Sequence, residues 1–179
     1  MKAINRARKI RMVITDVDGT LTDGTLLVLP DGEEVKAYHV RDGMGVLLAQ
    51  LAEIEVGIIT GKVSRGLEKR AERLKITELH QGIIDKKKAL DEIMQRKKLR
   101  PDEIAYIGDD LGDIDVLRTV GLAAAVADAH PVVKEHSHYI TRLGGGRGAF
   151  RELIEYILEA QNKWGVIRTR FKEIFDRKV

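Results

Sequence analysis

The fold of this chain is decided by the stretch Asp16-Val-Asp-Gly-Thr-Leu-Thr-Asp-Gly24, which follows the apolar run Ile10 to Ile14. A short apolar run that is rich in β-branched residues and ends at a polar, glycine-containing cluster predicts a buried strand. Asp16 and Asp18 then lie just past the carboxyl end of that strand. Because residues two apart point to the same side of an extended chain, both carboxylates are expected to share one site.

Two carboxylates in one site repel each other unless a cation or a proton compensates. A hard divalent cation prefers oxygen ligands, and Mg²⁺ is the expected ion. Taken alone, the acidic pair also fits a plain β-turn capped by Gly19. Three further motifs downstream favour the metal site over the turn.

Composition limits the classes of protein that the chain can represent. Its 179 residues fit one domain, and 44% hydrophobic with 33% charged residues is typical of a soluble globular protein. No run approaches the ~18 consecutive apolar residues of a membrane span, and the basic segment Met1 to Arg11 lacks the apolar core of a signal peptide. We therefore expect a cytoplasmic protein without a membrane partner.

The side-chain inventory excludes further chemistry. The absence of cysteine rules out disulfides, thiolate catalysis and cysteine-bound zinc. A net charge of +3 favours an anionic ligand, while only 4% aromatic residues leave few stacking platforms for bases. We expect a small anionic substrate and no nucleic-acid partner.

Apolar runs alternate with helical patterns along the chain. Val56–Ile59 ends in Thr60-Gly61, and Ile104–Ile107 ends in Gly108-Asp-Asp-Leu-Gly-Asp113. This alternation predicts an α/β fold, a Rossmann-like and mostly parallel sheet flanked by helices, although it leaves the strand order open. In such sheets ligands bind outside the carboxyl ends of the strands, where these motifs fall.

Two segments depart from the alternation. The turn Pro30-Asp31-Gly32 joins two short β-like runs and predicts a hairpin over about residues 25–39. We expect one domain over residues 1–160 and a helical tail over residues 161–179. The tail has four apolar residues at helical spacing and is expected to dock on its own domain or on a partner; these residues are Trp164, Ile167, Phe171 and Ile174.

The motif residues permit phosphoryl transfer through a carboxylate. Asp16 can attack phosphorus, and Asp18 can protonate the leaving alkoxide and later activate water. Asp109 would join Asp16 and Asp18 in the metal site, with a backbone carbonyl and waters. Thr60 and Lys86 would hold phosphate oxygens and spread the charge of the transition state.

Each of the downstream residues also has an ordinary interpretation. Thr60 before Gly61 can cap a turn, and Lys86 can lie on a solvated helix face. Asp109 and its acidic neighbours can be a helix N-cap cluster. The order of the motifs favours the functional interpretation.

That order is Asp-x-Asp on the first strand, an apolar run ending in Thr-Gly, a lysine, and then Gly-Asp-Asp-x-x-Asp. It resembles the haloacid dehalogenase superfamily of phosphatases, over Ile10 to about Arg151. The resemblance implies a phosphatase domain over residues 1–160, with Mg²⁺ as the cofactor and Asp16 as the nucleophile.

A narrower resemblance rests on the motif-one stretch with Val40-Arg-Asp-Gly43, Val126-Ala-Asp-Ala-His-Pro131 and Gly145-Gly-Arg-Gly-Ala149. Together they are similar to the 3-deoxy-D-manno-octulosonate 8-phosphate phosphatase family, the capless branch of the superfamily. The resemblance implies a role in lipopolysaccharide precursor synthesis. It also implies a homotetramer whose hairpins pack together and partly cover a neighbouring site in place of a cap domain.

One expected substrate-binding residue departs from the pattern of the family. The position after Thr-Gly is commonly arginine in this family and glutamate in the related nonulosonate phosphatases, whereas this chain has Lys62. Lysine keeps a positive charge for a sugar-acid carboxylate but lacks the bidentate fork of arginine. Arg41 and Arg147 are further candidates for binding the substrate.

Two other functions stay open at this point. One is a phosphatase that acts on a nine-carbon keto sugar acid or another small phosphate ester. The other is a non-enzymatic phosphoacceptor resembling receiver domains, which also combine acidic residues, threonine and lysine around Mg²⁺. In receivers the phosphorylated aspartate lies on a later strand than the acidic pair, whereas here Asp18 stands beside the expected nucleophile.

Overall fold

A computed structural model describes residues 2–176 of the chain. Six strands form one sheet in the order β5-β4-β1-β6-β7-β8, and all neighbouring pairs are parallel. The predicted parallel α/β fold is confirmed. The strands are β1 (Met12–Thr15), β4 (Glu55–Ile59), β5 (Glu78–His80), β6 (Ile104–Gly108), β7 (Leu122–Ala125) and β8 (Tyr139–Ile140).

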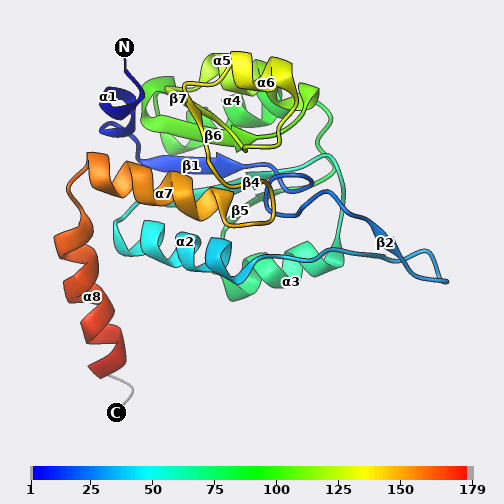
Figure 1. The fold of residues 1–179 in the computed structure, drawn as a ribbon, viewed down its shortest axis with the longest axis horizontal. Helices are drawn as coiled ribbons and strands as arrows, with labels where there is room; N and C mark the ends of the chain where they lie inside the picture. Colours follow the sequence, from blue (N-terminus) through cyan, green and yellow to red (C-terminus); the bar gives the residue numbers. More distant parts are fainter. Residues whose placement is uncertain (1, 177–179) are drawn as a thin grey trace.

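Helices cover both faces of the sheet (Figure 1). One face carries α1 (Ala3–Ala7), α2 (Val40–Leu51), α3 (Arg65–Arg73) and α7 (Ala149–Ala160), and the other carries α4 (Lys86–Lys97), α5 (Ile114–Thr119) and α6 (Pro131–Glu135). Two 3₁₀ turns, Pro101–Glu103 and Leu111–Asp113, flank β6. Helices lie on both faces because the chain moves in both directions along the sheet, first from β1 to β5 and then from β6 to β8. Right-handed crossovers that move in opposite directions place their helices on opposite faces.

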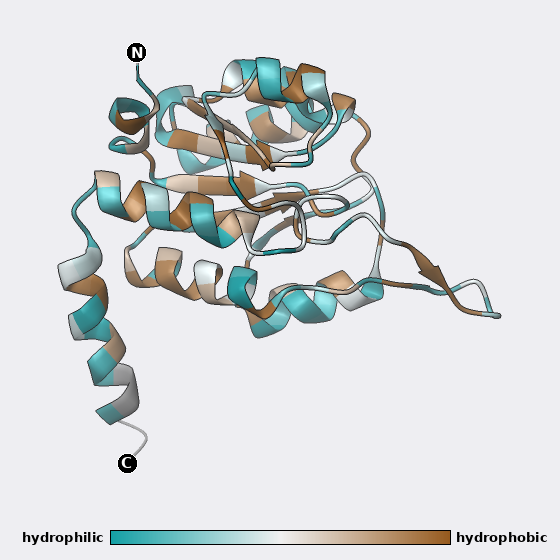
Figure 2. Cartoon of the chain, in the orientation of Figure 1, coloured by the Kyte–Doolittle hydropathy of each residue, from teal (hydrophilic) through white to brown (hydrophobic). Residues whose placement is uncertain are grey.

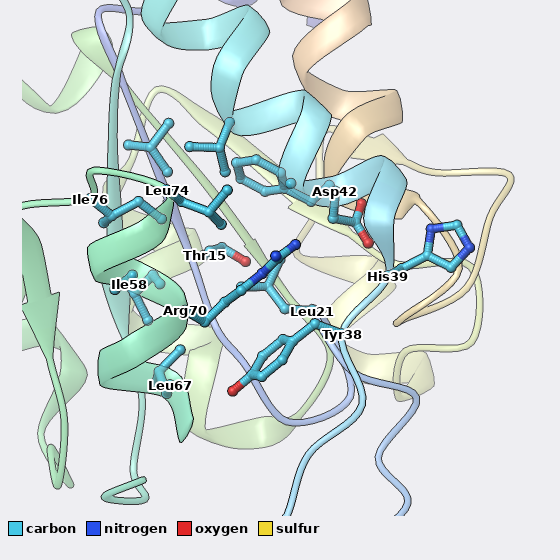
Figure 3. Close-up of a pocket in the computed structure, with 15 residues that line it drawn as sticks. Thr15, Leu21, Tyr38, His39, Asp42, Ile58, Leu67, Arg70, Leu74 and Ile76 are labelled. Atoms are coloured by element: carbon cyan, nitrogen blue, oxygen red, sulfur yellow. The ribbon is translucent and has the colours of Figure 1, made fainter. Parts of the chain in front are cut away.

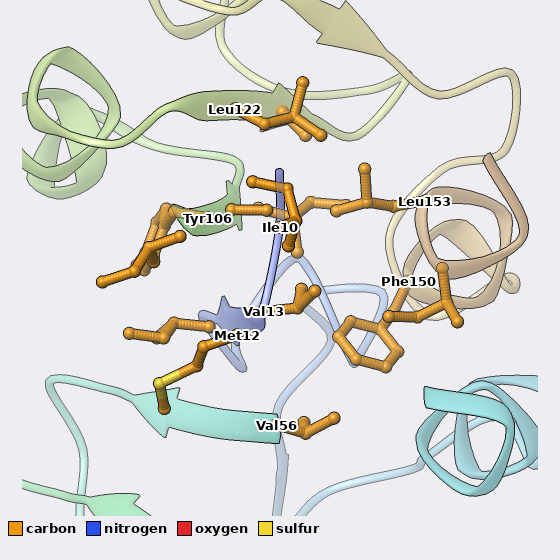
Figure 4. Close-up of a cluster of buried hydrophobic side chains, with 14 of the residues drawn as sticks. Ile10, Met12, Val13, Val56, Tyr106, Leu122, Phe150 and Leu153 are labelled. Carbon is orange, nitrogen blue, oxygen red and sulfur yellow. The ribbon is translucent and has the colours of Figure 1, made fainter. Parts of the chain in front are cut away.

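The core lies between the sheet and its helices (Figure 4). All residues of β1 and β6 are buried, which explains why these strands are continuous apolar runs rather than alternating patterns. Tyr106 of β6 and Phe150 of α7 are the largest side chains that are fully buried. Burial of one such aliphatic or aromatic side chain stabilises the fold by about 1.5–3 kcal/mol.

The sheet has a switch in strand order beside β1. From β1 the chain continues to β4 and β5 on one side, and it then crosses to β6 on the other side. The register pairs Thr15 with Ile58 and with Ile107, so all three strands end at one edge. A crevice for ligands is expected at such a point.

The hairpin is a separate two-stranded antiparallel ladder of β2 (Leu27–Val28) and β3 (Glu34–Val35) that projects from the domain (Figure 1). The prediction of a hairpin is confirmed, although the ladder itself is shorter than the predicted segment. Figure 2 shows apolar residues on the projecting strand. Five of them are 41–64% exposed, namely Leu26, Leu27, Val28, Leu29 and Val35.

The tail forms helix α8 (Trp164–Asp176), which contacts α2 of the same chain. Ile167 is buried, and the Arg170 Nη1 atom donates to the carbonyl of Leu51 at 2.6 Å. The side chain of Ile174 lies outside the described residues. Within residues 2–176, no helix combines the length and the apolar character that crossing a membrane requires.

Edge strand β5 is tied to α4 by a buried carboxylate. Arg96 donates to both oxygens of Glu78 at 2.7 Å, and Lys97 and His80 lie within 3.2 Å of them. The hydrogen bonds from Arg96 are the largest cause that lowers the pKa of Glu78 from 4.5 to about 2. The folded state therefore favours the ionised form.

We expect Glu78→Gln to lower the free energy of unfolding at pH 7 by about 1–3 kcal/mol. Because the pKa of Glu78 is depressed, its contribution is present above pH 4.5 and is lost as the pH falls towards 2. Urea unfolding of both proteins at several pH values measures this. The control Glu72→Gln removes one partner of an exposed pair with Lys69 and should leave the free energy of unfolding unchanged. If the wild type and Glu78→Gln differ in free energy of unfolding by the same amount at every pH, the ionised form of Glu78 is not the cause.

Candidate active site

Asp16 begins the site directly after β1. Its amide donates to the carbonyl of Ile107 at 3.0 Å, which continues the ladder with β6 and fixes the backbone at this edge. The residue is 6% exposed. Its carboxylate oxygen Oδ1 accepts a hydrogen bond from Lys86 Nζ at 2.7 Å. The predicted nucleophile and the predicted phosphate-binding lysine are thus direct neighbours.

Lys86 reaches the site because it is the first residue of α4. Asp85 caps this helix by accepting from the amide of Lys88 at 2.9 Å. Lys86 Nζ also donates to Asp113 Oδ1 at 2.7 Å. Burial lowers the pKa of Lys86, but the two carboxylates outweigh it and raise the pKa above its usual value. The solvated-face interpretation is wrong for Lys86 and fits the partly exposed Lys87, which pairs with Asp91, instead.

Asp109 and Asp113 complete an acidic cluster after β6. Thr20 of the motif-one loop donates its hydroxyl to Asp109 Oδ1 at 3.0 Å. Asp113 Oδ1 accepts from the hydroxyl of Tyr106 at 2.6 Å, and its Oδ2 accepts from the amide of Asp109 at 3.0 Å. The cap interpretation applies to Asp110, which accepts from the amide of Leu111.

The cluster fits a divalent cation. One carboxylate oxygen from each of Asp16, Asp109 and Asp113 lies within 4.8 Å of the others. Burial and then repulsion by Asp113 raise the pKa of Asp16 from 3.8 to about 6, although Lys86 opposes the shift. Burial and then repulsion by Asp16 and Asp113 raise the pKa of Asp109 to about 7. The cluster therefore contains more negative charge than Lys86 compensates.

The backbone leaves room for these oxygens at Gly19. A Cβ atom there would lie 2.0 Å from Asp109 Oδ2, and Gly19 has φ +87°, so a side chain is excluded by contact and by backbone conformation. The glycine of motif one thus opens a space for the carboxylate. This is a second observation that fits an ion bound between motif one and β6.

Asp18 lies outside this cluster of oxygens. Both of its carboxylate oxygens lie 2.5 Å from Lys36 Nζ, at the base of the hairpin. Its role as a metal ligand stays a prediction.

Thr60 and Lys62 follow β4 at the same edge. Thr60 is 1% exposed, and its amide donates to the carbonyl of His80 at 2.9 Å. Lys62 Nζ lies 3.0 Å from Glu34 of the hairpin, and both side chains are partly exposed. Such exposed pairs are weak, so Lys62 can exchange this partner for another anion. Lys62 and Lys36 line an open groove of about 760 Å³ between the hairpin and residues 62–66.

The two predicted arginines lie elsewhere. Arg147 pairs with Asp23 at 3.2 Å and is largely exposed. Arg41 lines a surface depression beside Arg142 and Arg151. Within residues 2–176 neither arginine contacts the acidic cluster, so their binding roles stay predictions.

The glycine-rich loop beside Arg147 packs on motif one. A Cβ on Gly145 would lie 1.7 Å from the carbonyl oxygen of Gly19, and the amide of Gly146 donates to the backbone carbonyl of Thr20 at 3.0 Å. Only glycine allows this approach of two backbones. The loop therefore supports the shape of motif one.

A small cavity lies on the α2–α3 side of β1 (Figure 3). Its volume is about 20 Å³, enough for about one water and too small for a sugar phosphate. Arg70 and Tyr38 line it, and burial and then the charge of Asp18 raise the pKa of Tyr38 to about 12. The substrate is therefore expected at the open edge of the sheet.

Sequence reasoning missed four polar residues around the site, namely Thr20, Lys36, Tyr106 and Asp113. Asp113 was visible in the quoted motif, and its spacing of four residues from Asp109 could have suggested contact. Thr20 stands in motif one, but its partner Asp109 is 89 residues away. Lys36 and Tyr106 carried no local signal, because their partners are 18 and 7 residues away.

Comparison with known proteins identifies the family. A family model for haloacid dehalogenase-like hydrolases matches residues 71–144. The 3-deoxy-D-manno-octulosonate 8-phosphate phosphatase of Yersinia pestis is 49% identical over 160 residues, which cover 89% of this chain and 86% of that protein. The phosphatase of the same name from Escherichia coli strain K12 is 46% identical over 160 residues, covering 89% and 85%.

Solved structures agree with this relationship. The enzyme of that name from Moraxella catarrhalis, solved with a magnesium ion, a phosphate ion and a KDO molecule, superposes with a TM-score of 0.91 at 36% identity. The match covers 94% of this chain and 97% of that one. With the acidic cluster and its lysine at the carboxyl edge of a parallel sheet, the chain belongs to the 3-deoxy-D-manno-octulosonate 8-phosphate phosphatase family of haloacid dehalogenase-like hydrolases.

Proposed function

We propose that this protein hydrolyses 3-deoxy-D-manno-octulosonate 8-phosphate to the free sugar acid and phosphate, with Mg²⁺ as cofactor and Asp16 as nucleophile. One observation carries the proposal. Asp16 belongs to the acidic cluster and accepts a hydrogen bond from Lys86, with Asp18 two residues away, in a chain that is 49% identical to a phosphatase of that name. This arrangement supplies a nucleophile, a cation and an acid at one edge.

The reaction proceeds in two displacements. In the first, an Asp16 oxygen attacks phosphorus and the bond from phosphorus to the sugar oxygen breaks; that oxygen keeps the electron pair and takes a proton from Asp18. In the second, water attacks phosphorus and gives its proton to Asp18. The bond from phosphorus to the Asp16 oxygen then breaks, which releases phosphate and restores both side chains.

The surrounding charges lower the barrier to these steps. Lys86 contacts Asp16 and donates hydrogen bonds where phosphate oxygens arrive, and Thr60 adds a hydroxyl at the end of β4. Asp16, Asp109 and Asp113 would hold Mg²⁺, which supplies positive charge to offset the repulsion between the nucleophile and the phosphate. The same residues explain why an anionic nucleophile can approach an anionic substrate.

Substrate choice is assigned to the groove beside the hairpin. Its volume of about 760 Å³ suits a sugar phosphate, and Lys62 brings a weakly paired cation to it for the sugar-acid carboxylate. Arg41 and Arg147 remain candidates for the outer part of the substrate. A nine-carbon keto sugar acid offers the same phosphate and carboxylate, and it is the alternative substrate.

The assembly is proposed to be a cytoplasmic homotetramer in lipopolysaccharide precursor synthesis. Support comes from the projecting hairpin, whose apolar residues reach 64% exposure at Val28. A contiguous apolar strand of this kind favours association with other subunits. Packing of hairpins would also shield a site that has no cap domain.

The first test is phosphate release from the octulosonate phosphate, its nine-carbon analogues and common sugar phosphates, each with Mg²⁺ and with a chelator. We expect preference for the octulosonate ester and loss of turnover in the chelator. Preference for another ester would agree with the proposed mechanism but contradict the octulosonate phosphate as the substrate. A stable phosphoprotein without turnover would favour the phosphoacceptor function instead.

We expect Asp16→Asn to abolish turnover without weakening the fold. Burial and Asp113 raise the pKa of Asp16 from 3.8 to about 6, so its ionised form destabilises the folded state as the pH rises through this range. Asparagine removes that cost. Urea unfolding with chelator at pH 8 should give a midpoint at or above that of the wild type, and a folded variant that still turns over would exclude Asp16 as nucleophile.

We expect Val28→Asp to dissociate the oligomer, because a charge at the centre of an apolar interface is costly to bury. Light scattering after size exclusion measures the mass, and turnover should fall severalfold when the sites lose their cover. Gln95→Asp on the exposed face of α4 adds the same charge away from the hairpin as a control. A variant that keeps the wild-type mass would contradict assembly through the hairpin.

A further inference from the structure

Lys36 is a buried cation at the base of an exposed hairpin. All residues from 23 to 35 are exposed, whereas the Lys36 side chain is only 3% exposed. It turns back from the end of β3 to the active site, where Nζ lies 2.5 Å from both oxygens of Asp18. Because a lysine ammonium is normally kept in water, its burial needs a compensating anion, and Asp18 supplies it.

The orientation of the Asp18 carboxylate rests on this contact, as each neighbouring carboxylate rests on a partner of its own. Asp16 is held by Lys86, Asp109 by Thr20 and Asp113 by Tyr106. Within residues 2–176, the Asp18 carboxylate has Lys36 as its sole hydrogen-bond partner. A cation that contacts both oxygens fixes the rotation of the carboxylate as well as its position.

We propose that Lys36 is a positioning residue, which orients the Asp18 carboxylate for proton transfer and so makes the hairpin part of the acid/base apparatus. This inference rests on the proposed role of Asp18 in the two displacements. Proton transfer needs the carboxylate within hydrogen-bond reach of the leaving oxygen and later of water. Through this ion pair the hairpin links assembly at the surface to the chemical step.

The test compares esters with different needs for an acid. Lys36→Met removes the charge at similar length and should lower kcat on the octulosonate phosphate about 10- to 100-fold, part of the effect of a general acid, with KM nearly unchanged. With p-nitrophenyl phosphate the leaving group departs as a stable anion without a proton. Its first turnover, seen as a burst of p-nitrophenolate, should keep the wild-type rate.

Two results would overturn the inference. A raised KM with unchanged kcat would make Lys36 a substrate-binding residue. An equal loss of the burst rate and of kcat on the sugar ester would mean general damage to the site. If the wild type hydrolyses neither ester, the proposed function fails and the inference with it, whereas an active wild type isolates the effect of Lys36.

A double-mutant cycle tests whether Lys36 acts through Asp18. Adding Lys36→Met to Asp18→Asn should cost no further activity, because the carboxylate to be oriented is already gone. If the double variant instead loses activity by the product of the two single losses, the two residues act independently and the inference is wrong. Lys36→Arg keeps the cation and should retain most of the kcat, which also covers the case that the methionine variant folds poorly.

The matched control is Ala37→Ser, the next residue in the same hairpin segment. Ala37 is exposed and lies outside the lining of the groove assigned to the substrate. It should show wild-type kinetic constants, burst and mass. A change in this control equal to that of Lys36→Met would mean that any alteration of the hairpin acts on the site, and would overturn a specific role of Lys36.

Discussion

The structure depends on confining three carboxylates and one ammonium at the carboxyl edge of a parallel sheet. Asp16, Asp109 and Asp113 bring their oxygens within 4.8 Å of one another, and Lys86 balances part of this charge. Burial and repulsion raise the pKa values of Asp16 and Asp109 to about 6 and 7. A divalent cation held by these carboxylates would balance the remaining negative charge.

The rest of the fold keeps these groups in place. The apolar strands β1 and β6 provide a rigid base, and the switch in strand order beside β1 opens the crevice. Lys86 is the first residue of α4, which follows the edge strand β5. Tyr106 of β6 donates its hydroxyl to Asp113. Each charged group is fixed by a partner from another element, which is how a site retains one geometry.

The hairpin connects the molecular surface to this edge. Its tip exposes apolar residues, its side contacts Lys62 through Glu34, and its base places Lys36 on Asp18. An uncapped site lacks a domain that could close over the substrate. Here a short insertion provides an exposed apolar surface, a groove wall and a cation together.

The parallel α/β class and the hairpin could be predicted from the sequence alone. The same holds for the candidate site groups Asp16, Asp18, Thr60, Lys86 and Asp109. These features are local, since side-chain period and turn chemistry act over a few residues. Only the tertiary structure decided the strand order, the contact of Lys86 with Asp113, the pairing of Lys36 with Asp18 and the distance of Arg41 from the cluster. Strand order and these contacts follow from the packing of segments far apart in the chain, which no local pattern specifies.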